Sequence, residues 1–208
     1  MKFKIKKVKE KGVTLIEIVI AIFIITIFSL IVVNDFPRMK RQFAIAGVTY
    51  RLAQDIRRAE DLGMSGMQVS GASNTKGYGF YVNINFPENK NKYWIYADIG
   101  DTADRKFSGT LQDCSPETEG DCIIETINIS DYETGVYIKR IEYFDNISDN
   151  FMPTNSLSIN FNPPNPTVII TSGEEGTSKR IKIVLGLYLD DTVERIIYVN
   201  SAGLIEVE

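Results

Sequence analysis

The segment KGVTLIEIVIAIFIITIFSLIVV, residues 11–33, is the most apolar part of this chain and limits the folds that it can adopt. From Val13 to Val33 it contains 21 residues, and Glu17 is the only charged one among them. A helix of that length rises about 30 Å, which matches the hydrocarbon core of a bilayer. The stretch therefore predicts a helix that spans a membrane.

Glu17 is out of place in a simple membrane anchor. A carboxylate inside a bilayer costs on the order of 3 kcal/mol on insertion scales, so it is retained where a partner or a function compensates. The partner must be a hydrogen-bond donor or a cation. The alternative is a plain anchor that carries a stray acidic residue.

The segment before the apolar stretch is strongly basic, with six lysines and one glutamate in residues 1–11. A basic segment followed by an apolar one is either a cleaved secretory signal or a retained signal anchor. The apolar part of a secretory signal has only about 7 to 15 residues, which favours the anchor. The positive-inside rule then keeps residues 1–12 in the cytoplasm and places the chain after Val33 outside it.

Gly12, the following VTLIE and the unbroken apolar run resemble the class III signal of type IV pilins and type II secretion pseudopilins. The resemblance implies that a prepilin peptidase cuts between Gly12 and Val13, and that the new N-terminus is methylated. Thr14 and Leu15 match the same signal and, with Glu17, are expected to serve in assembly. Glu17 becomes the fifth residue of the mature chain and matches the family's glutamate, which pairs with the N-terminal amine of a neighbouring subunit. Val13 departs from the phenylalanine with which mature members usually begin.

The same resemblance implies the partners and the location. The partners are the prepilin peptidase, other pilins or pseudopilins in a filament, the inner-membrane assembly platform, and the lipid bilayer before assembly. The chain would cross the cytoplasmic membrane once, with its head extracytoplasmic, and then enter a pilus or pseudopilus at the cell surface or in the periplasm. Whether the filament serves secretion, motility, adhesion or DNA uptake stays open.

Residues 34–66 are expected to continue the helix in amphipathic form. Apolar residues recur three or four positions apart from Ile45 to Leu62, and Gly63 and Gly66 supply a stop. The alternative is a break at Pro37 between the anchor and a separate helix of the following domain, because proline removes one backbone hydrogen bond.

Residues 67–208 are expected to form one β-rich extracytoplasmic head. Short alternating segments, separated by clusters of Asp, Asn, Gly and Pro, predict eight or nine strands, and the first two predict a hairpin. Together with the helix they indicate an α+β fold of the type IV pilin kind, a long N-terminal helix packed on antiparallel sheet. The segments are 77–86, 92–99, 122–129, 135–144, 156–161, 167–171, 180–189, 192–200 and 204–207.

The C-terminal third, residues 156–208, is similar to the GspH/FimT branch of minor pseudopilins and pilins, as is RLAQDIRRAEDLGMSG, residues 51–66. In that branch a strand ends at a Phe-x-Pro-like turn. The chain then finishes with a strand, an Asn/Ser-Gly turn and a short last strand. This resemblance favours a minor subunit.

Two further groups of residues are candidate sites. Cys114 and Cys122 would close a short loop as a disulfide, which stabilises by about 2 to 3 kcal/mol, and the alternative is two free thiols. Asp98, Asp101 and Asp104 lie three apart in an expected loop and could hold calcium. A solvated polar loop is favoured, because the D-x-D-x-D-G pattern of a calcium loop is absent.

The composition argues against catalysis. The chain has no histidine, which removes the commonest general base and metal ligand, and it has no P-loop or G-x-S-x-G motif. We expect neither enzymatic activity nor a cofactor. An extracytoplasmic enzyme on a signal anchor is the least favoured alternative.

The charge distribution argues against a body coated with nucleic acid. Without residues 1–12 the chain keeps 17 basic and 26 acidic side chains. Arg57 and Arg58 could contact DNA. The expected alternative is that they form ion pairs with Asp61 or Glu60. The second functional hypothesis is a membrane-anchored binding protein or adhesin, with DNA as one ligand, that enters no filament.

Overall fold

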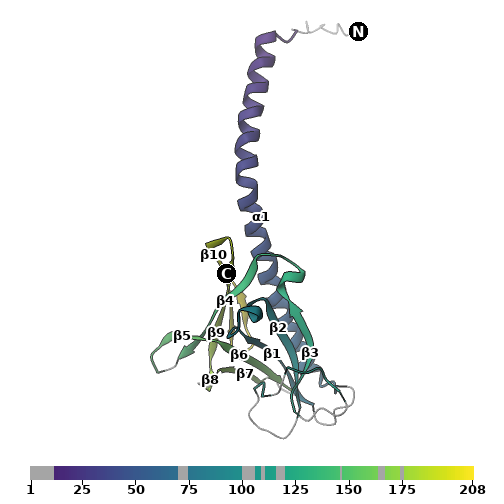
Figure 1. Ribbon diagram of the computed structural model, residues 1–208. Coiled ribbons are helices and arrows are strands. Elements are labelled where there is room, and N and C mark those ends of the chain that lie inside the picture. The colour runs from purple at the N-terminus through teal and green to yellow at the C-terminus, as the bar shows by residue number, and fades with distance from the viewer. Residues whose placement is uncertain are drawn as a thin grey trace, which may run out of the picture. The chain divides into compact units, whose positions relative to one another are not determined.

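The structure is a computed structural model, and the chain divides into two units, unit 1 (Met1–Arg41) and unit 2 (Gln42–Glu208). It combines one long apolar N-terminal helix with an antiparallel β-sheet head, which confirms the predicted α+β class (Figure 1). The described residues are 12–69, 75–99, 106–108, 111–115, 120–145, 147–163, 167–173 and 176–208.

The helix α1 runs from Leu15 to Ser65. Pro37 lies inside this helix, so the alternative of two helices separated at Pro37 is wrong. A proline removes only one of the many backbone hydrogen bonds of so long a helix. After Ser65 the chain leaves the helix at Gly66, whose φ of 60° is a left-handed conformation that glycine adopts without strain, as predicted. Gly63, the other predicted stop, lies buried inside α1, so the prediction is wrong for that residue.

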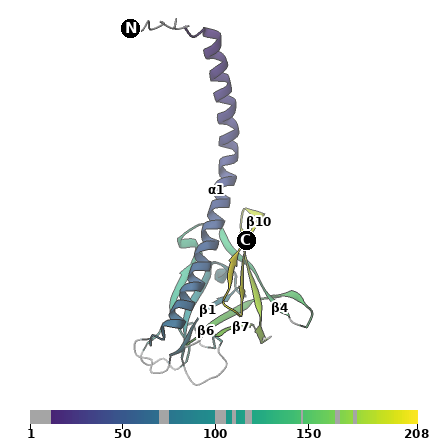
Figure 2. The same ribbon diagram turned by 180° about the vertical axis from the view of Figure 1, so that it is seen from behind.

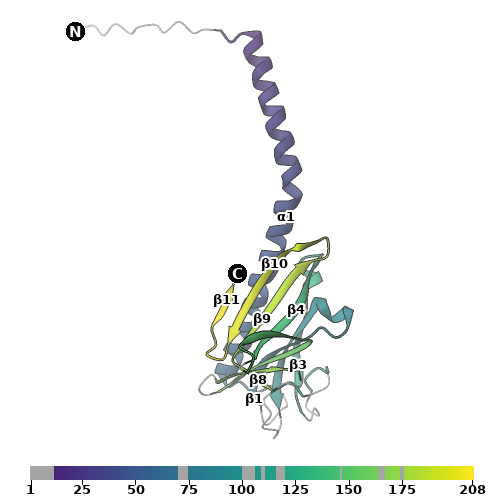
Figure 3. The same cartoon turned by 90° about the vertical axis from the view of Figure 1, so that its left-hand side faces the viewer.

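The strands form two antiparallel sheets (Figures 1 and 3). Sheet A has the order β3 (Cys122–Asn128), β2 (Lys92–Ile99), β1 (Thr75–Asn83), β6 (Ser156–Asn162), β7 (Thr167–Ser172) and β8 (Thr177–Ser178). Sheet B has the order β11 (Ile205–Val207), β10 (Asp190–Asn200), β9 (Arg180–Leu187), β4 (Val136–Asp145) and β5 (Asn150–Thr154). Two short 3-10 helices, η1 (Pro87–Asn91) and η2 (Ile129–Asp131), lie in the connections.

Each predicted segment contains a strand, and β1 and β2 pair as the predicted hairpin. Two predicted ends are wrong: β1 stops at Asn83 and β9 at Leu187, so residues 84–86 and 188–189 lie outside the strands. The structure adds two strands that the sequence did not predict, β5 and β8. β5 contains Pro153 and pairs only with β4, which fits the confinement of proline to edge strands. β8 has two residues, too few for an alternating pattern.

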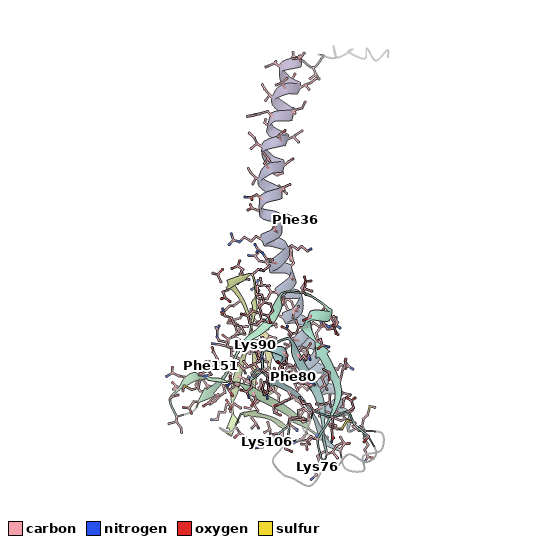
Figure 4. All side chains as sticks on the ribbon, in the orientation of Figure 1. Phe36, Lys76, Phe80, Lys90, Lys106 and Phe151 are labelled. Atoms are coloured by element: carbon pink, nitrogen blue, oxygen red, sulfur yellow. A yellow bond between two sulfur atoms is a disulfide. The ribbon has the colours of Figure 1, made fainter. Side chains whose placement is uncertain are left out.

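The main core of unit 2 lies between α1 and the two sheets. From α1 it takes the residues of the predicted amphipathic face, among them Ile45, Leu52 and Ile56, which are fully buried. Each such side chain contributes about 1.5 to 3 kcal/mol on burial. Figure 2 shows this part of α1 beside sheet A, and Figure 4 shows Phe80 of β1 inside unit 2.

The opposite face of sheet A is also partly buried. Trp94, Tyr96 and Ile123 form a second apolar cluster there, against which Tyr81 and Phe107 pack. Strand β2 is therefore buried on both faces, whereas its alternating pattern predicted one buried face. Phe107, which follows the end of β2 by eight residues, supplies cover that the alternating pattern does not reveal.

Candidate functional site

The N-terminal end of α1 is closed by a pair of reciprocal hydrogen bonds. The carbonyl of Thr14 accepts from the backbone N–H groups of Glu17 (3.1 Å) and Ile18 (3.3 Å), so Thr14 is the residue that caps the helix. The Glu17 N–H donates to Thr14 Oγ1, and the Thr14 N–H donates to Glu17 Oε2, both at 3.4 Å. This arrangement is a capping box, and its bonds are long and exposed to solvent.

The capping box supplies donors for Glu17 that the sequence analysis missed, although T-x-x-E was visible in VTLIE. Backbone and hydroxyl groups contribute dipoles and no positive charge. Both local bonds from Thr14 reach Oε2. Across the described residues, Glu17 takes part in none of the ion pairs, so its charge is not neutralised there.

The apolar stretch after the cap is exposed along its length. The large hydrophobic residues from Val13 to Val33 are exposed on every side of α1, and Phe36 continues them (Figure 4). The helix is long and apolar enough to cross a membrane, and the apolar part has no buried residue. A helix that is apolar all round needs cover from lipid or from other helices. The N-terminal segment therefore fits a membrane anchor.

The bond at which processing was predicted lies just before the helix. Gly12, Val13 and Thr14 have no helical structure and are exposed. Leu15 is the first residue of α1. The backbone around Gly12 and Val13 is thus free of helical hydrogen bonds, which suits binding in an extended form by a peptidase.

Cys114 and Cys122 form a disulfide in the structure, with their Cα atoms 4.9 Å apart. Two backbone bonds tie the segment around Cys114 to β3: the Cys114 N–H donates to the Ile123 carbonyl, and the Ile123 N–H donates to the Gln112 carbonyl. Cys122 is buried beside Tyr78. Disulfides persist in oxidising compartments, which agrees with an extracytoplasmic head.

The proposed calcium loop is placed differently by the structure. Asp98 lies in β2 and is buried, which agrees with the strand predicted at 92–99 and shows that the alternative expectation of a loop is wrong for this residue. Asn160 Nδ2 donates to Asp98 Oδ2 at 2.8 Å, a bond that accounts for a carboxylate inside the head. Asp101 and Asp104 lie outside the described residues. Among the residues that the structure does describe, no group of three or more acidic or cysteine side chains could hold a metal.

The two arginines of α1 contact other elements of unit 2. Arg58 Nη1 pairs with Glu125 Oε2 of β3 at 2.7 Å, and Arg57 Nη2 donates to the Ile205 carbonyl of β11 at 3.3 Å. The predicted pairing of Arg58 with a neighbour on its own helix is therefore wrong. Tertiary packing places the Glu125 carboxylate of β3 next to Arg58, a contact that spacing along the helix does not show.

Comparison with known protein families finds a match at the N-terminus. Residues 7–33 match the prokaryotic N-terminal methylation motif. The match supports a type IV pilin-like protein. It covers the apolar stretch and the residues on both sides of the predicted cleavage point. No curated protein and no solved structure matches the chain significantly.

Proposed function

We propose that the chain is a structural subunit of a type IV pilus or a type II secretion pseudopilus, in the role of a minor pilin or pseudopilin. The observation that carries the proposal is the methylation motif at residues 7–33, which coincides with a helix whose apolar residues are exposed all round. Its residues act through assembly rather than catalysis.

Processing would occur between Gly12 and Val13, in the non-helical segment before α1. Prepilin peptidase removes residues 1–12 and leaves Val13 with a free amine, which is then methylated. Thr14 and Leu15 remain at the start of the mature chain. The short distance from the new amine to the cap keeps the N-terminus and Glu17 in one small region.

Assembly would use the charge that the capping box leaves unneutralised. A carboxylate and an amine attract each other strongly where water is excluded, and each is costly there alone. Pairing between Glu17 and the Val13 amine of a neighbouring subunit satisfies both. The apolar helices then bundle in the filament core, so that lipid is replaced by other helices.

Before assembly the protein would be stored in the cytoplasmic membrane, with unit 2 outside, and would reach the filament through the inner-membrane assembly platform. The disulfide suits that location. Membership of the GspH/FimT branch is supported by the end of the chain. β10 and β11 are joined by a turn in which Asn200 Oδ1 accepts from the Ala202 N–H at 2.9 Å, and Gly203 has a φ of 82°.

The test of processing is mass spectrometry of the chain purified from membranes of the native host. We expect a chain that starts at Val13 and carries one added methyl group. In a host strain without prepilin peptidase, the same chain should retain residues 1–12. Detection of Met1 or Lys2 on the chain while the peptidase is active would contradict the proposal.

A further inference from the structure

One end of unit 2 gathers several connections around the point where the chain enters this unit at Gln42. Arg51 of α1 lies over the ring of Tyr132, 3.3 Å from its centroid, which places the turn before β4 beside the helix. The Tyr188 N–H donates to the Gly135 carbonyl at 3.0 Å, so the β9–β10 turn lies next to that turn. Tyr188 Oη also contacts Asn91 Oδ1 of η1 at 3.3 Å. Figures 1 and 3 show this end, here called the entry end.

The entry end is rich in exposed apolar and aromatic side chains. The members of this entry-end patch are Phe43, Tyr50, Tyr132, Tyr188 and Leu189, all of them within unit 2. Phe43 and Tyr50 are seven residues apart on α1 and so lie on one face of the helix. That face points away from the core, which Ile45, Val48 and Leu52 enter.

The β9–β10 turn has an unusual composition. Its two residues are Tyr188 and Leu189, whereas two-residue hairpin turns favour Asn, Asp and Gly. Tyr188 stacks on Tyr137 with ring centroids 4.2 Å apart, which holds the turn in place. Leu189 is 83% exposed and finds no cover. A leucine so exposed buries little apolar surface within the chain, and with the aromatic side chains near it Leu189 enlarges an exposed apolar patch, which is the feature that marks an interaction site.

The chain itself brings this end close to the membrane. The apolar stretch ends at Val33 and unit 2 begins at Gln42, nine residues later. Nine residues span at most about 32 Å even when fully extended. If residues 13–33 cross a bilayer, the bilayer surface is therefore within this reach of Gln42, and the entry end is the part of unit 2 nearest to it along the chain.

We propose that, before assembly, the entry-end patch rests in the interfacial layer of the lipid bilayer. Three of its five members are tyrosines, whose apolar ring and polar hydroxyl suit the boundary between headgroups and acyl chains. Charged residues of both signs lie at this end as well: Arg51 on α1, Lys90 in η1, Asp131 in η2 and Asp190 at the start of β10. The contact is therefore apolar and does not require anionic lipid. This proposal rests on the proposed function in one respect: residues 13–33 must span the membrane.

Fluorescence quenching can test this contact on the full chain. Cys114 and Cys122 are joined, so a cysteine introduced as Leu189→Cys is the single free thiol for an environment-sensitive fluorophore. The chain is placed in nanodiscs of phosphatidylcholine, one copy per disc. Ile147→Cys is the matched control, because Ile147 is 95% exposed and lies in the β4–β5 turn, at the opposite end of β4.

We expect nitroxides on the acyl chains to quench the label at position 189 roughly twofold or more above the label at 147, as for groups that enter the headgroup boundary. Equal quenching at the two positions, with the chain still in the discs, would overturn the membrane contact and leave the proposed function standing. Protection of position 189 only in assembled filaments would also overturn it, in favour of a neighbouring subunit. A chain that fails to enter the discs would count against the membrane anchor itself, and hence against the proposed function.

Discussion

Thr14 and Glu17 cap α1 reciprocally: each donates its backbone N–H to the side chain of the other at 3.4 Å. The carboxylate that stood out in the apolar stretch thus has a local structural role in the single chain. This role uses its acceptor atoms and leaves its charge available. Capping and assembly can therefore be separated by substitutions that change one property and keep the other.

Loss of the cap should loosen only the first turn of α1. Thr14→Ala removes the hydroxyl that accepts from the Glu17 N–H, a change that costs about 1 kcal/mol of helix stability. Amide hydrogen exchange of the chain in nanodiscs should show faster exchange at residues 15–18. Thr26→Ala is the control, because Thr26 Oγ1 donates to the Ile22 carbonyl inside the helix and caps nothing. Unchanged exchange at residues 15–18 in Thr14→Ala would contradict the cap.

The packing of α1 on sheet A should depend on a glycine. A Cβ at position 63 would lie 2.6 Å from the Phe161 carbonyl oxygen of β6, so Gly63→Ala must push helix and strand apart. We expect it to lower the free energy of unfolding by about 1 to 3 kcal/mol in chemical denaturation.

Gly47→Ala is the matched control in the same helix, because a Cβ there meets no atom within 4 Å. Alanine is favoured over glycine in helices by up to about 1 kcal/mol, so this variant should be as stable as the wild type or more so. Equal destabilisation by the two substitutions would refute the close approach of α1 and β6.

Sheet B carries an ion network that should make the head sensitive to acid. Hydrogen bonds from Arg140, at 2.7 and 2.8 Å, lower the pKa of Glu194 to about 2, and Lys139 adds to the effect against the opposing influence of burial. Burial alone would raise the pKa of Glu142, but Lys182 and Arg140 hold it below its ordinary value.

A carboxylate with a depressed pKa in the folded state stabilises above its unfolded pKa of about 4.3, and the stabilisation is lost as the pH falls through the folded pKa. Glu194→Gln should therefore lower the free energy of unfolding at pH 7, and its difference from the wild type should narrow from about pH 5 to pH 2. Glu206→Gln, an exposed carboxylate on β11, is the control. A difference for Glu194→Gln that does not change with pH would contradict the network.

The disulfide should contribute measurably to stability. Closing the short loop between Cys114 and Cys122 is worth about 2 to 3 kcal/mol through the entropy of the unfolded chain. We expect the double variant Cys114→Ser/Cys122→Ser to lose this amount in chemical denaturation. Wild-type protein with a reductant should have the same stability as the double variant. If both were as stable as the oxidised wild type, the disulfide would make no contribution.

The sequence predicted most of the fold because periodicity reports burial on one side of an element. Periodicity predicted α1 and the strands with a clear alternating pattern, which are all of them except β5 and β8. Periodicity within one segment does not show which side chains from other segments contact it. Phe107 covers the second face of β2, and Glu125 replaces the expected partners of Arg58. Short edge strands such as β8 have too few residues for any period.

For the candidate site, the motif located the functional end of the chain but not its local geometry. Glu17 was recognised by its charge in an apolar surrounding, a contrast that sequence shows directly. Its bonds to Thr14 depend on where the helix begins, and the start at Leu15 is known from the structure.

The most direct test of the assembly role is the incorporation of Glu17→Gln into filaments purified from the native host. Glutamine can keep the capping box but carries no charge. We predict that the wild-type chain is present and that incorporation of Glu17→Gln falls on the order of a hundredfold or more, because removing one partner of a buried ion pair costs about 3 to 5 kcal/mol. Incorporation of the glutamine variant at the wild-type level, or absence of the wild-type chain from the filaments, would contradict this role.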